Sequence, residues 1–195
     1  MNRVIDQAKK DLVALFDFDV NEPLITLIDT RREMDLVLGR KTESWMVGTA
    51  FGFRNIYIFN PAVFPKVSGR KAEDFWQVLR HEYCHIYIKQ MVKTDRPIWL
   101  NEGFACYFAG QSLAAKTISE KELLNFSEYY HRGGKGVYFI GQFWVELLIK
   151  QLGIKKFVQL IKSFEPNMTV QNFSRKFKKV YGFNANKKGF SALLR

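Results

Sequence analysis

The sequence HEYCHIYI (His81 to Ile88) predicts a buried helix. Between Arg80 and Lys89 it carries one formal charge, that of Glu82, and it is apolar almost all the way round. A helix of this kind is normally buried in the protein. Burying a carboxylate without a partner costs several kcal/mol, so a cation is expected close to Glu82.

His81 and His85 stand at positions i and i+4 of this expected helix. Both imidazoles therefore project from one helical face, with their Cβ atoms about 5–6 Å apart. That spacing suits two nitrogen ligands that converge on one zinc ion, and Glu82 lies beside the same face. An HExxH match also arises by chance in ordinary helices, so the motif requires a further ligand elsewhere in the chain.

A second segment has the same unusual feature. The stretch PIWLNEGFACYFAGQSLAA (Pro97 to Ala115) has the length of a helix and one charge, that of Glu102. The short link between the two segments makes them antiparallel neighbours. At about 1.5 Å per residue, His85 lies roughly 10 Å before the turn and Glu102 roughly 8 Å after it. We therefore predict Glu102 as the third metal ligand, together with His81 and His85.

The remaining pattern predicts an α+β fold, with a small, mostly antiparallel N-terminal sheet followed by a mainly helical half. At 195 residues the chain has the length of one domain, which we expect to contain a sheet-bearing lobe (1–70) and a helical lobe (71–195). Apart from helices in the first fifteen residues and in RREMDLVL, the N-terminal part contains three β-type runs, PLITLID (23–29), WMVGTAFGF (45–53) and NIYIF (55–59).

The composition is that of an ordinary folded protein, with 47% apolar and 25% charged residues, which excludes fibrous and disordered classes. No apolar run approaches the roughly 18 residues that a membrane span needs. The N-terminus lacks the apolar core of a secretory signal, so we expect a cytoplasmic protein. Cys84 and Cys106 lie in apolar helical segments and are interpreted as small buried side chains rather than as a disulfide.

The net charge is +11, and much of the excess lies in RKFKKVYGFNANKK (Arg175 to Lys188). Phe177, Val180 and Tyr181 recur there at helical spacing, which is typical of a packed amphipathic helix with a solvated basic face. A surface that contacts nucleic acid or another anion is the second interpretation, and both stay open.

Two motifs together resemble the gluzincin branch of zinc metallopeptidases. In that branch HExxH, here HEYCH, and a downstream glutamate, here that of WLNEGFACYFAG, bind the metal. The motif WLNEGFA most resembles the peptidase MA-like group. The stretch YFIGQFWVELLIKQLGIKKFVQLI is similar to that group's helix bearing a tyrosine. The resemblance covers residues 71–195 and implies a zincin-like fold that binds Zn²⁺ through His81, His85 and Glu102.

The chemistry of such a site is that of a zinc-dependent peptidase acting on a peptide or protein. Three protein ligands leave one zinc position open for water, whose pKa the metal lowers to about 7. Glu82 would take the proton of this water and pass it to the leaving amine. The resemblance implies Tyr138 as a donor to the developing oxyanion, although a tyrosine packed in the core is the alternative. His131, in a glycine-rich loop, is another candidate donor.

Two other functions stay open. The chain could be a nucleic-acid-associated protein whose zinc is structural, or a gluzincin-like module that binds zinc and a partner without turnover. A structural zinc site is closed by four protein ligands and needs no adjacent base, so the position of Glu82 favours the peptidase. Cleavage within or at the end of a peptide, and the oligomeric state, do not follow from these residues.

Overall fold

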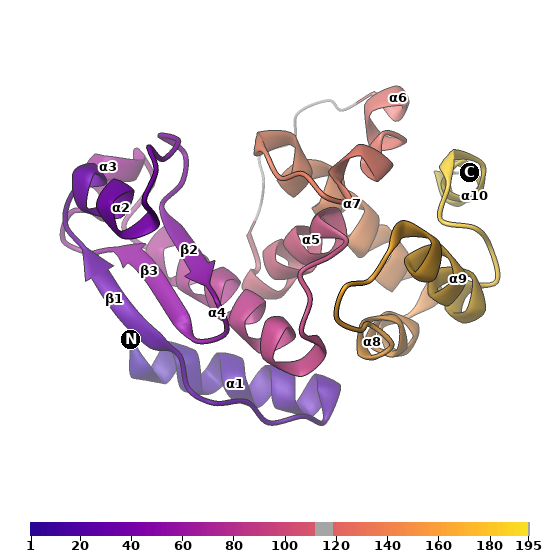
Figure 1. Cartoon of the computed structure of the whole chain (residues 1–195), viewed down its shortest axis with the longest axis horizontal. Helices are drawn as coiled ribbons and strands as arrows, with labels where there is room; N and C mark the ends of the chain where they lie inside the picture. The colour runs from indigo at the N-terminus through magenta and orange to yellow at the C-terminus, as the bar shows by residue number, and fades with distance from the viewer. Residues whose placement is uncertain (112–118, 195) are drawn as a thin grey trace. The chain divides into compact units, whose positions relative to one another are not determined.

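The computed structural model describes residues 1–111 and 119–194 (Figure 1). The chain divides into two compact units, Met1–Gln90 and Met91–Arg195. The first contains three strands and helices up to most of α4, in the order α1 (Asn2–Phe16), β1 (Leu24–Ile28), α2 (Arg31–Leu38), β2 (Gly48–Phe51), β3 (Asn55–Phe59), α3 (Phe64–Ser68) and α4 (Asp74–Val92). The single domain predicted over residues 1–195 stays a prediction.

The regular elements of the second unit, within its described residues, are all helices or 3₁₀ turns. Its elements are α5 (Ile98–Ala109), α6 (Glu120–Leu123), the 3₁₀ turn η1 (Phe126–Tyr129), α7 (Lys135–Leu152), α8 (Ile154–Lys162), α9 (Val170–Tyr181), α10 (Lys187–Ser191) and the 3₁₀ turn η2 (Ala192–Leu194). The predicted α+β class, with the sheet first and the helices after it, is therefore confirmed. No helix in the described residues is long and apolar enough to cross a membrane.

The sheet has three strands in the order β1-β3-β2 and is mixed. Strand β2 pairs with β3 antiparallel across a turn at Gly52, whereas β1 pairs with β3 parallel. One of the two pairings is thus parallel, where a mostly antiparallel sheet was expected. The reason is that α2 and β2 lie between β1 and β3 in the chain and return it to the same end of the sheet, as a parallel pair requires.

Helix α4 is fixed within the first unit by hydrogen bonds from its buried polar side chains. The Tyr87 hydroxyl donates to the carbonyl oxygen of Phe18, which follows α1. The Gln90 amide accepts from the backbone N–H of Asn21 at 2.8 Å, and it donates to the carbonyls of Asn21 and Phe53 at 2.9 Å. Because Phe53 belongs to the β2–β3 turn, Gln90 joins the C-terminal end of α4 to the sheet.

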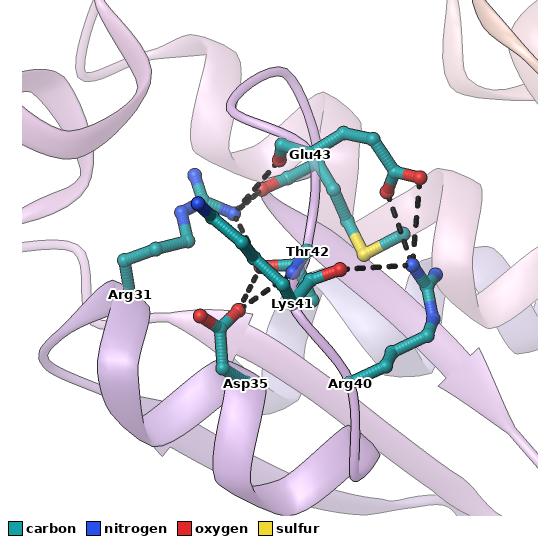
Figure 2. Close-up of polar contacts among 7 residues, drawn as sticks. Arg31, Asp35, Arg40, Lys41, Thr42 and Glu43 are labelled. Carbon is teal, nitrogen blue, oxygen red and sulfur yellow. Dashed lines mark hydrogen bonds and ion pairs between the residues drawn. The ribbon is translucent and has the colours of Figure 1, made fainter.

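The segment that leads into β2 is held on α2 by a set of charged side chains (Figure 2). The Arg31 guanidinium donates to the carbonyl oxygens of Glu43 at 3.2 Å, Ser44 at 3.0 Å and Met46. Its Cζ atom also lies 4.7 Å from the centre of the Phe59 ring of β3. One arginine therefore fixes the path of the chain immediately before β2, because hydrogen bonds from a charged donor are stronger than neutral ones.

Asp35 completes this arrangement from the next turn of α2 (Figure 2). Its carboxylate accepts hydrogen bonds from the Thr42 backbone N–H at 2.7 Å and from the Thr42 hydroxyl at 2.6 Å. These hydrogen bonds lower the pKa of Asp35 below its usual value, since they favour the charged form. The loop between α2 and β2 is therefore attached at both of its ends.

In the second unit, α5 and α7 meet backbone to backbone at two glycines. A Cβ atom on Gly103 would lie 2.2 Å from the carbonyl carbon and oxygen of Gly141, and one on Gly141 would lie 2.1 Å from the carbonyl oxygen of Trp99. Helix α5 ends at Ala109 with Gly110 in the left-handed region, so it is shorter than the helix-length segment Pro97 to Ala115. Residues 112–115 of that segment lie outside the described residues.

The glycine contact gives a stability prediction. Gly103→Ala should lower the free energy of unfolding by about 3 kcal/mol or more, because the new methyl group meets backbone atoms that cannot rotate away. This cost exceeds the gain of about 1 kcal/mol in helix propensity. The measurement is urea unfolding, with Gly133→Ala as the control, since a Cβ atom there meets nothing within 4 Å. Equal stability of the two variants would contradict the close contact.

Candidate metal centre

The two histidines of HEYCH lie on α4 and are buried, with 5% of His81 and 8% of His85 exposed. Their Nε2 atoms are 3.0 Å apart, and the two rings are nearly perpendicular, at 80°. Two nitrogens bound to one tetrahedral zinc at about 2.0–2.1 Å lie roughly 3.3 Å apart. The pair is therefore already close to the spacing that a shared metal ion imposes.

Glu102 lies on α5, between the buried residues Asn101 and Gly103, and is itself partly buried. His81, His85 and Glu102 each offer one ligand atom, and these three atoms lie within 4.8 Å of one another. The three residues predicted as ligands from the sequence therefore form a group that can hold a metal ion. Two imidazole nitrogens and one carboxylate oxygen suit several first-row transition metals, zinc among them.

Glu82 is also buried, at 8% exposed, and it packs against the edge of the sheet. A Cβ atom placed on Gly48, the first residue of β2, would lie 3.2 Å from Glu82 Cγ and 3.3 Å from its Oε1 atom. The carboxylate of Glu82 therefore approaches the backbone of β2. Gly48 is not among the site residues predicted from the sequence, although a glycine inside a strand pattern indicates a place where another group comes close.

Tyr138 lies on α7 and is partly buried. Gly141 follows it by three residues, so the two share one side of the helix. Gly141 is the residue that meets Gly103, the direct neighbour of Glu102. Tyr138 therefore lies on the side of α7 that packs on α5. Its predicted role as a donor stays a prediction.

The other candidate residues lie elsewhere. His131 is exposed, and its ring packs edge-on against Tyr130 with the ring centres 4.6 Å apart. The structure does not place it in the group with His81, His85 and Glu102. Cys84 and Cys106 are both buried and form no disulfide, as expected.

Comparisons with protein-family models, with curated proteins and with solved structures find no match to this chain.

The three-residue group gives a metal-binding prediction. The purified chain should bind one zinc ion, and zinc at 100 times its dissociation constant should raise the free energy of unfolding by about 2.7 kcal/mol. His85→Ala should weaken zinc binding more than about 100-fold. Loss of a residue that only hydrogen-bonds to a metal ligand already lowers metal affinity by about 10–100-fold. Calorimetric titration and thermal unfolding with and without zinc measure both quantities.

His131→Ala is the matched control, since His131 is the remaining histidine of the chain and is exposed. It should bind zinc as the unchanged protein does. An equal loss of affinity in the two variants would place the metal outside the predicted group.

Proposed function

We propose that this chain is a zinc-dependent peptidase in which His81, His85 and Glu102 bind the metal and Glu82 is the general base. The observation that carries the proposal is the convergence of three ligand atoms within 4.8 Å, with a buried carboxylate on the residue next to one ligand. The resemblance of HEYCH and WLNEGFA to the gluzincin motifs supports it.

His81, His85 and Glu102 would hold the zinc ion, which would supply Lewis acidity and make a bound water molecule more acidic. Glu82 follows the ligand His81 directly in the chain, and its buried carboxylate is not among the three ligands. In the proposed reaction it accepts the proton of the attacking water and delivers it to the leaving amine of the cleaved bond.

A peptide substrate fits the position of β2. This strand is at the end of the strand order β1-β3-β2, so within the described sheet it has one neighbour and one edge open to further pairing. An extended peptide can add to such an edge through backbone hydrogen bonds. Gly48 brings this strand next to the Glu82 carboxylate. A bond held along β2 would therefore lie close to the general base.

Tyr138 is the proposed donor to the oxyanion that forms when the peptide carbonyl is attacked. A hydroxyl placed at the developing charge lowers the energy of the transition state. Its support is the position on the side of α7 that meets α5 next to Glu102, together with the resemblance.

A structural zinc site is the alternative. Within the described residues the ligand group has three members, one fewer than the four that close a structural site. A carboxylate buried on the residue next to a ligand is also not needed to close a structural site. Both observations favour catalysis over a purely structural metal.

The general base gives the first test. Glu82→Gln should bind zinc as the unchanged protein does but should cleave peptides about 10²–10⁴-fold more slowly, since the amide cannot accept the proton. The measurement is cleavage of a diverse peptide mixture followed by mass spectrometry, with the zinc content determined in parallel. Glu22→Gln, an exposed glutamate, is the control and should be fully active. Equal rates in both variants would contradict the role of Glu82.

The close approach of β2 gives a second test. In Gly48→Ala the new methyl group would press on Glu82 and on Val78, which would have to give by a few tenths of an ångström. The cleavage rate should therefore fall about tenfold while zinc binding is kept. Thr49→Ala is the control, because successive side chains of a strand point to opposite faces of the sheet. The rates of the two variants are compared at equal zinc content. An unchanged rate in Gly48→Ala would show that this contact does not position the base.

A further inference from the structure

The positive charge of the chain is distributed very unevenly. Residues 1–90 contain 13 Lys and Arg and 12 Asp and Glu, a net charge of +1. Residues 91–195 contain 17 Lys and Arg and 7 Asp and Glu, a net charge of +10. Residues 151–194 alone contain nine basic residues and one acidic residue. An asymmetry of this kind is a feature of proteins that bind polyanions, since solubility alone does not require it.

The basic side chains project from three helices whose apolar sides are buried. In α8 the buried residues are Phe157, Leu160 and Ile161, and in α9 they are Phe173, Phe177 and Tyr181. Helix α8 packs on α9 (Figure 1). Phe190 of α10 stacks on Phe177 of α9 with the ring centres 5.5 Å apart. Seven lysines of these helices are exposed, and besides Lys162 they are Lys155, Lys156, Lys178, Lys179, Lys187 and Lys188. We call the last six residues the basic surface.

Little negative charge balances the basic surface. Glu165 is the one acidic residue between positions 151 and 194, and it pairs with Lys176 at 3.4 Å. Lys155 and Lys156 also occupy the first turn of α8, which contains no acidic residue. A cation at a helix N-terminus is unfavourable by about 0.3–1 kcal/mol, because the helix dipole is positive there. The local structure therefore does not explain these two lysines.

The apolar side chains of these helices indicate which polyanion fits. A membrane-binding helix needs large apolar side chains beside its cations, and in residues 151–194 Val170 is the one large apolar side chain that is strongly exposed. Single-stranded nucleic acid is bound largely by bases that stack on exposed aromatic rings, and the rings of α9 and α10 are buried. Contacts to phosphates alone are what non-specific binding to a duplex needs.

We propose that the basic surface of α8, α9 and α10 binds the phosphate backbone of double-stranded nucleic acid without reading its sequence. This proposal does not depend on the metal or on peptidase activity. Binding would be governed by the release of counterions. The logarithm of the binding constant would then fall with the logarithm of the salt concentration, with a slope of about −0.9 for each phosphate contacted on duplex DNA.

The experiment uses the full chain and a fluorescent 20-base-pair duplex DNA of mixed sequence, with anisotropy measured between 50 and 200 mM NaCl. The expected result is binding that weakens steeply with salt. A variant with Lys155→Gln, Lys178→Gln and Lys179→Gln should bind more weakly, and its salt slope should be about 3 units shallower, since three phosphate contacts are lost.

A matched variant, Arg32→Gln, Lys66→Gln and Arg70→Gln, removes the same charge from exposed positions of the first unit. Because both variants have a net charge of +8, a difference in binding reports the position of the charges. The matched variant should keep the original slope, and circular dichroism melting shows that both variants are folded.

Three outcomes would overturn the proposal. The first is no duplex binding at 50 mM NaCl, and the second is an equal loss in the two variants, which would indicate a general effect of net charge. The third is binding to vesicles that contain phosphatidylserine with none to the duplex, which would make an anionic membrane the partner.

Discussion

The burial of charge within α4 is the constraint on which the rest of the first unit depends. His81, Glu82 and His85 lie on two consecutive turns of α4, within the stretch 81–88 in which every residue is buried. Burying a carboxylate costs several kcal/mol of desolvation, which paired charges and hydrogen bonds reduce. A metal ion held by the two imidazoles and by Glu102 would add positive charge in the same part of α4 and would reduce this cost further.

The sheet contributes to this arrangement through one strand. Arg31 and Asp35 hold the loop that precedes β2, and Gln90 holds the turn that follows it. Strand β2 is therefore fixed at both ends. Because Gly48 has no side chain, the Glu82 side chain can lie close to the backbone of the strand. The hydrogen bonds of this surface loop therefore help to position the buried carboxylate, because both involve β2.

The ligand group could be predicted from the sequence because its signals are local. The sequence alone shows two histidines one helical turn apart. It also shows a single glutamate in each of two apolar segments. The parallel pairing of β1 with β3 could not be predicted, because strand direction depends on where the chain returns after α2 and β2, and no single segment records this. The same holds for Gly48 and for the contact of Gly103 with Gly141, since each glycine is explained only by its distant partner.

The charge of the second unit has to be explained separately from the metal. The proposed ligand group and the proposed general base involve few charges, and residues 1–90, with a net charge of +1, contain both histidines and Glu82. Electrostatic attraction of a neutral peptide would gain nothing from nine basic residues between positions 151 and 194. Repulsion among them lowers the stability of the folded unit, and an anion that screens the charges reduces this cost. A polyanionic partner therefore accounts for a feature that peptide cleavage alone leaves unexplained.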